Sequence, residues 1–130
     1  MRARLDRLVV SMLLAATGCT GEGPSPVDPS GDLDVTAAFE QGPPHAGRNT
    51  LVVDVADARG EPVDDAIVTV DPQMPAHGHG STEDPVVEPG TAGRYVAYPV
   101  TFQMAGTWLV TITATAGEST GTLVLEVDIP

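Results

Sequence analysis

The feature that most constrains this chain is an alternation of apolar and polar residues that recurs from Asp32 to the C-terminus. Apolar residues at every second position place one face of a strand against a core. Turns rich in glycine and proline separate the runs, and no segment has the period of an amphipathic helix. We therefore predict an all-β fold, a small antiparallel β-sandwich of about seven strands. The clearest runs cover residues 33–39, 51–55, 66–70, 95–102, 108–114 and 123–129.

Two residues within these runs carry separate expectations. Pro99 has no backbone N–H to donate, so we expect the run 95–102 to be an edge strand or to bend at this point. Trp108 is the only tryptophan of the chain. The pattern places it on an inward face, where we expect it to anchor the core.

The N-terminus has the pattern of a secretory signal. Residues 1–7 are basic and residues 8–17 form an apolar run, which is too short to cross a bilayer because a span needs about 20 residues. Small residues then precede Cys19, the only cysteine, as in a bacterial lipobox. We predict that residues 1–18 are a lipoprotein signal peptide and that Cys19 is lipidated. An ordinary signal peptide with an incidental cysteine is the alternative.

The segment after the predicted lipidation site is a candidate tether. Residues 20–31 are dominated by proline, glycine and serine and offer little apolar surface to bury. We therefore expect residues 19–31 to form a lipidated, flexible tether and residues 32–130 to form the folded domain. This organisation predicts a protein held on a membrane of the cell envelope by an N-terminal lipid anchor.

Charge excludes one class of partner. The chain has 18 acidic residues against 6 basic ones, a formal net charge of −12 at pH 7. Such a surface repels phosphate backbones, so we expect no nucleic-acid binding.

A single cysteine also leaves no intramolecular disulfide to form.

The segment Met74–Gly80, MPAHGHG, concentrates the metal-binding side chains of the chain. Pro75 disfavours a helix interior, and the two glycines permit a tight turn, so we predict a rigid loop. Imidazole and thioether groups suit copper, and imidazole also suits zinc. Met74, His77, His79 and, from a later turn, Met104 form the predicted metal site, with copper favoured over zinc. If Met104 packs in the core instead, the two histidines are only exposed turn residues.

Other polar residues give weaker signals. His45 has the setting of a plain loop residue. Glu83, Asp84 and Glu88 follow the histidine segment and offer oxygen ligands for Cu(II) or Zn(II), although such a run is typical of a solvated loop. Ser81 lies close to them in sequence, but no nucleophile elbow or oxyanion-hole motif accompanies it. We therefore expect no enzymatic activity.

Three segments taken together resemble the YtkA-like domain family. They are GEPVDDAIVTV, then MPAHGHG, then GRYVAYPVTFQMAGTWLVTI, and the resemblance spans about residues 33–128. It implies an immunoglobulin-like β-sandwich on a secreted protein or lipoprotein of the bacterial envelope. It also suggests a connection with copper or respiratory-metal handling. Where other members have a second methionine in the loop, this chain has His77, so its ligand set differs.

Two functional hypotheses follow. In the first, the chain is a membrane-tethered accessory or carrier protein that binds copper and passes it to an envelope acceptor. In the second, it is a non-catalytic interaction module that docks on an envelope protein complex, and the MPAHGHG segment is a contact surface without metal. The arrangement of the four ligand side chains discriminates between them.

Overall fold

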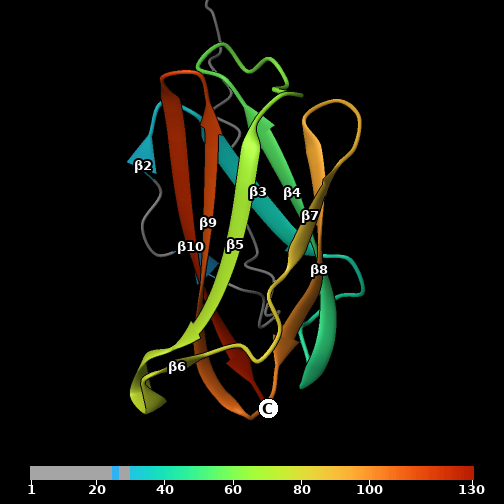
Figure 1. Cartoon of the computed structure of the whole chain (residues 1–130), viewed down its shortest axis with the longest axis vertical. Helices are drawn as coiled ribbons and strands as arrows, with labels where there is room; N and C mark the ends of the chain where they lie inside the picture. Colours follow the sequence, from blue (N-terminus) through green and yellow to red (C-terminus); the bar gives the residue numbers. More distant parts are fainter. Residues whose placement is uncertain (1–24, 27–29) are drawn as a thin grey trace, which may run out of the picture.

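The computed structural model describes residues 25–26 and 30–130, with side chains from residue 31 onward. It is a β-sandwich of two antiparallel sheets (Figure 1). One sheet has the strand order β1-β10-β9-β5-β6, with β2 also paired to β10, and the other has the order β3-β4-β8-β7. The strands are β1 (Ser25–Pro26), β2 (Ser30–Gly31), β3 (Asp34–Phe39), β4 (Gly47–Ala56), β5 (Ile67–Met74), β6 (His79–Gly80), β7 (Val86–Pro89), β8 (Arg94–Phe102), β9 (Gly106–Ala116) and β10 (Ser119–Ile129).

This order confirms the predicted immunoglobulin-like sandwich. Across one sheet, β3, β4, β8 and β7 take the places of strands A, B, E and D. In the other sheet, β5, β9 and β10 take those of C, F and G. Among the described residues, seven strands have four or more residues and three have two. The long strands therefore match the expected number.

The core lies between the sheets and is filled by the alternating residues. In β5 and β9, buried and more exposed positions alternate along the strand, as the sequence pattern requires. Trp108 is fully buried, and its ring packs edge-on against Phe102 of the opposite sheet with the ring centroids 5.3 Å apart. The expectation that Trp108 anchors the core is confirmed.

The run containing Pro99 bends, as expected, but it is not an edge strand. β8 lies between β4 and β7, and its pairing with β4 shifts register between Asn49 and Leu51. Opposite this irregularity lie Tyr98 and Pro99, joined by a cis peptide bond. A bulge absorbs a residue that cannot donate to the ladder, so the proline is accommodated inside the sheet.

Three local features differ from the sequence expectations. The predicted loop after Met74 begins with one turn of 3-10 helix, η1 (Pro75–His77), which accepts Pro75 because its first N–H has no partner to lose. The edge strand β7 was not predicted, because Pro85 precedes it, Pro89 ends it and Glu88 interrupts its apolar run.

The third difference concerns the predicted tether. Ser25–Pro26 and Ser30–Gly31 pair with β10, so these four residues belong to the larger sheet rather than to a flexible segment. The predicted signal peptide and Cys19 lie outside the described residues. Within the part of the chain that the structure describes, no helix is long and apolar enough to cross a membrane.

Candidate metal site

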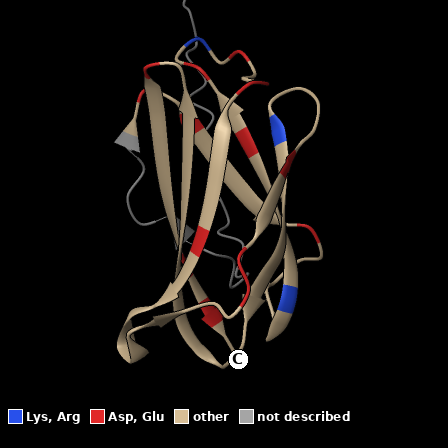
Figure 2. Cartoon of the chain, in the orientation of Figure 1, with Lys and Arg blue, Asp and Glu red and all other residues tan. Residues whose placement is uncertain are grey.

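Three connections meet at one end of the sandwich, and we call this the histidine end. It comprises residues 40–46 between β3 and β4, residues 75–80 after β5, and residues 103–105 between β8 and β9, with Gly106 at the start of β9. Glu40 is the one acidic residue among them and none is lysine or arginine, although the chain carries a net charge of −12. Figure 2 shows the β5–β6 hairpin without a charged residue at the lower end of the ribbon.

The predicted histidine segment forms this hairpin. Met74 pairs with His79 and Gln73 pairs with Gly80. η1 and Gly78 connect the two strands, and Gly78 has φ 63°, a left-handed conformation that glycine adopts without strain. The segment is therefore a closed turn on a sheet, in agreement with the expected rigidity.

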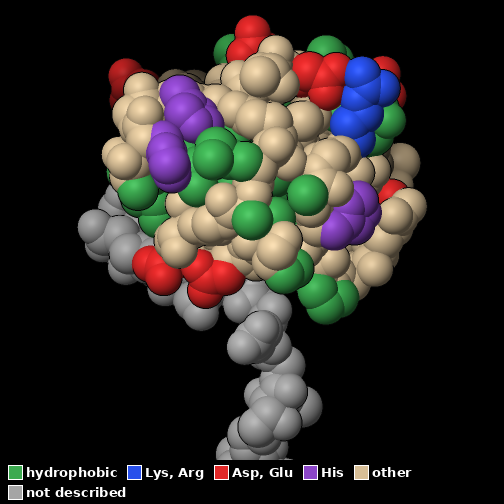
Figure 3. All heavy atoms as spheres, turned by 90° about the horizontal axis from the view of Figure 1, so that it is seen from below, with side chains coloured by type: hydrophobic (Ala, Val, Ile, Leu, Met, Phe, Trp, Pro, Cys, Tyr) green, Lys and Arg blue, Asp and Glu red, His purple; other side chains and the backbone are tan. Residues whose placement is uncertain are grey.

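The two imidazole rings are neighbours rather than diverging. Their centroids are 5.8 Å apart with an interplanar angle of 39°. An imidazole nitrogen binds zinc at about 2.0–2.1 Å, so two rings on one ion have centroids roughly 5–6 Å apart. Figure 3 shows two histidine side chains side by side on this end, next to apolar atoms, with another histidine further away. The spacing of His77 and His79 therefore fits a shared ion.

His79 also connects the hairpin to the core. Its ring lies edge-on to Trp108 with the centroids 5.9 Å apart. The indole nitrogen of Trp108 donates to the carbonyl oxygen of Met104 at 3.1 Å. Trp108 thus contacts both the histidine hairpin and the loop that carries the second methionine.

The two methionines lie at the same end of the sandwich, and the surroundings of Gly106 show where the Met74 side chain ends. A Cβ atom at Gly106 would collide with the terminal methyl group of Met74. Met74 therefore reaches the turn that follows Met104. Met74 is 2% exposed, while Met104 is partly buried and packs against the core. All four predicted ligand residues lie at this end, with His77 exposed and Met74 buried.

The carboxylate version of the site is not assembled. Glu83 is committed elsewhere, because both of its oxygens accept from Arg48 and Oε2 also accepts from Thr101 at 2.6 Å. The hydrogen bond from Arg48, followed by that from Thr101, lowers the pKa of Glu83 below its usual 4.5. Among the described side chains, no group of three or more His, Cys, Asp or Glu could hold a metal ion.

The remaining candidates have structural partners. Ser81 donates its hydroxyl hydrogen to the carbonyl oxygen of Thr101 at 2.7 Å. His45 is exposed in a different connection from the other histidines, and its Nδ1 lies 2.9 Å from the carbonyl oxygen of Ala46. Asn49 closes this connection by accepting from the backbone N–H of His45 and donating to its carbonyl oxygen.

Sequence reasoning missed two residues of the histidine end. Gln103 donates to the carbonyl oxygen of Gly80 at 2.8 Å, and Gly106 leaves room for Met74. Neither residue type signals metal binding. Their positions beside Met104 were the only indication in the sequence.

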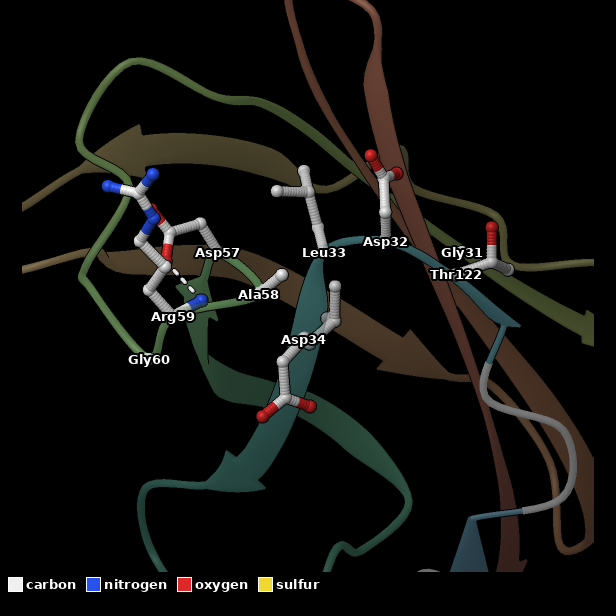
Figure 4. A pocket seen from close by; sticks show the side chains of 10 residues that line it. Gly31, Asp32, Leu33, Asp34, Asp57, Ala58, Arg59, Gly60 and Thr122 are labelled. Carbon is white, nitrogen blue, oxygen red and sulfur yellow. Dashed lines mark hydrogen bonds between the residues drawn. The ribbon is translucent and has the colours of Figure 1, made fainter.

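The opposite end of the sandwich contains a hollow of about 520 Å³, lined in part by Asp32, Asp34, Asp57 and Arg59 (Figure 4). Two of its three acidic residues accept hydrogen bonds from the backbone. Asp57 accepts from the backbone N–H groups of Arg59 and Glu61, and Asp32 accepts from that of Thr120. This hydrogen bond, followed by one from Ser119, lowers the pKa of Asp32 below its usual 3.8.

Comparison with known proteins adds one finding. The model of the YtkA-like family matches residues 28–113, more than half of the chain. No curated protein matches the chain significantly, and no solved structure does either. The match confirms the resemblance inferred from the three sequence segments: this chain belongs to the YtkA-like family.

Proposed function

We propose that this protein binds one copper ion, as Cu(I), at the histidine end and acts as a copper carrier or accessory protein of the cell envelope. The observations that support the proposal are the 5.8 Å between the ring centroids of His77 and His79 and the presence of Met74 and Met104 at the same end of the sandwich. Two imidazoles with two thioethers form a soft ligand set, which favours Cu(I) over zinc.

The burial of these residues suits a carrier. Met74 lies beneath the surface and His77 is exposed, so an ion would have protein on one side and solvent on the other. An open side gives an acceptor's ligands access to the ion. The connections at this end carry only one acidic residue, Glu40, so an acidic partner meets less repulsion there than from the rest of the domain.

The test is a Cu(I) titration against a chromogenic chelator. The full chain is used in detergent because of its apolar segment, and it carries Cys19→Ser so that the lone thiol does not compete for copper. We expect one equivalent of Cu(I) to be withheld from the chelator. The double variant His77→Ala/His79→Ala loses two of four ligands, so its affinity should fall by more than ~100-fold.

His45→Ala is the matched control, because it removes the remaining histidine without touching the hairpin. It should leave the affinity unchanged. Binding that the double variant retains, or that His45→Ala reduces equally, would show that copper associates with surface histidines in general. The metal proposal would then fail.

A second candidate function rests on the burial of the methionines. Met74 at 2% exposure, and Met104 packed against the core, are also what a hydrophobic core requires. In this case the histidine end is a contact surface of an interaction module that docks on an envelope complex. A chain that withholds no Cu(I) from the chelator would favour it.

The membrane anchor is part of the proposal and rests on the sequence alone. The lone Cys19 follows an apolar run and small residues, the pattern of a lipidation signal. Cells fed a labelled fatty acid should incorporate the label into the chain and not into the Cys19→Ser variant. Equal labelling of both would exclude Cys19 as the lipidated residue.

A further inference from the structure

Gln103 connects the two segments that carry the proposed ligands. It lies in the β8–β9 connection immediately before Met104. Its side-chain Nε2 donates to the carbonyl oxygen of Gly80 at 2.8 Å and lies 3.4 Å from Nδ1 of His79. The Gln103 side chain of the β8–β9 connection thus holds β6, the strand that carries His79, by a hydrogen bond.

The same carbonyl group determines which nitrogen of His79 is free. Nδ1 of His79 lies 3.1 Å from the carbonyl oxygen of Gly80. A carbonyl oxygen only accepts, so a hydrogen bond here requires the proton on Nδ1. In the neutral ring, Nε2 then has the lone pair that a metal needs. The oxygen has two lone pairs and accepts from both His79 and Gln103.

A competing arrangement exists at the same atoms. If Gln103 donated to Nδ1 of His79 instead, the neutral ring would carry its proton on Nε2, and that nitrogen could not bind a metal. The bond to Gly80 is shorter, at 2.8 Å against 3.4 Å, so the amide favours the carbonyl oxygen. Gln103 therefore contributes to the metal-competent form of the ring by holding Gly80.

We propose that Gln103 is a positioning residue of the copper site: by holding the Gly80 carbonyl group, it keeps His79 with Nδ1 protonated and Nε2 free. The inference rests on the proposed function. It assigns the ligand atom of His79 and gives a role to a residue that is not itself a ligand. Partners of this kind typically change metal affinity by about 10–100-fold.

The test compares Gln103→Leu with Gln73→Leu. Gln73 is a matched control because it lies on the same hairpin and its Nε2 donates to Asp71 at 2.8 Å rather than to Gly80. Both glutamines are exposed, so both variants should fold, and a thermal melt checks this. We expect the Cu(I) affinity to fall by about 10–100-fold in Gln103→Leu and to stay unchanged in Gln73→Leu.

A metal-free measurement separates this inference from the proposed function. Long-range ¹H–¹⁵N spectra of the apoprotein distinguish the two neutral forms of the imidazole. We expect His79 to be protonated on Nδ1 in the parent chain and in Gln73→Leu, and to become a mixture in Gln103→Leu.

The outcomes divide cleanly. An unchanged proton position in Gln103→Leu would overturn the inference whatever the affinity does. A shifted proton with an unchanged affinity would overturn the role at the metal. If the parent chain binds no copper, the proposed function fails and the metal role fails with it, while the spectra still report whether Gln103 orders His79.

Discussion

The two ends of the sandwich are built from the same kind of connection but have opposite chemistry. At the histidine end, the three connections carry a single acidic residue, Glu40, and Trp108 contacts His79 and the carbonyl oxygen of Met104. At the other end, which we call the acidic end, the connection 57–66 alone carries four acids and one arginine, and Figure 2 shows acidic residues on its loops. Asp57 and Asp64 there accept hydrogen bonds from backbone N–H groups, whereas the rings of His77 and His79 lie beside one another.

This contrast indicates which end of the domain has side chains available to bind a ligand. A carboxylate that already accepts two backbone hydrogen bonds stabilises a loop and has little capacity left for a ligand. Among the described residues, His79 is the one predicted ligand with a hydrogen-bond contact, at Nδ1 with Gly80 and Gln103, while Met74 and Met104 pack against the core. The hollow at the acidic end is therefore a consequence of loop structure, and the histidine end is the better candidate site.

The largest expected effect tests the packing beneath the histidine end. Gly106→Ala should destabilise the protein by about 2–5 kcal/mol, because the new methyl group collides with Met74 and because φ is 133°. Chemical denaturation measures this. Gly47→Ala is the control, since Gly47 also has a positive φ, of 102°, but open space around its Cβ position.

The difference between these variants isolates the contact with Met74. Gly47→Ala should show only the cost of backbone strain, about 1–3 kcal/mol. Equal losses in the two variants would mean that Met74 moves aside freely, and the packed methionine of the histidine end would be refuted.

A smaller effect is expected at the acidic end. The Tyr95 hydroxyl donates to the carbonyl oxygen of Val63 at 2.6 Å and accepts from the backbone N–H of Ala66 at 2.9 Å, which closes the connection 57–66. Tyr95→Phe leaves both groups without this partner, so we expect a loss of about 1–3 kcal/mol in denaturation experiments. Tyr98→Phe, at a residue 49% exposed, should change stability by less than about 0.5 kcal/mol.

Hydrogen exchange sharpens this prediction. Tyr95→Phe should speed exchange at the N–H of Ala66 and leave the Met74–His79 pair of the hairpin unaffected. Equal acceleration at both ends would contradict the view that each end is held by its own contacts.

The smallest effect is a pH dependence. Glu83, at the side of the histidine end, and Asp32, at the acidic end, have folded-state pKa values below 4.5 and 3.8. A carboxylate with a lowered pKa stabilises the fold above its unfolded pKa and loses that contribution as pH falls through the folded value. We expect Glu83→Gln to flatten the stability curve below about pH 4.5, and Asp32→Asn below about pH 3.8.

Acid titrations of the unfolding free energy measure both slopes. Asp84→Asn is the control for Glu83→Gln, since it removes the neighbouring acid. Asp32 is exposed and the Glu83 side chain is one-third exposed, so each slope should be shallow. A steeper slope on removal of either acid would contradict the direction of its pKa shift.

The alternation and the MPAHGHG segment were enough to predict the class of fold and to propose where along the chain a site would lie. Residues 108–114 and 123–129 alternate strictly, and a strand with one apolar face has to bury it, so the sandwich follows from the pattern. The MPAHGHG segment likewise indicates metal binding, because few other residues of the chain can bind a soft metal.

The order of the strands and the contacts between their connections could be found only in the folded structure. The alternation says which face of a strand is buried but not which strands are neighbours, so it could neither place β8 inside its sheet nor reveal the short edge strand β7. Met74 reaches Gly106, and Gln103 reaches Gly80, across connections that are far apart in sequence. Such contacts depend on strand order and register, which are set by packing of the whole core rather than by any local pattern.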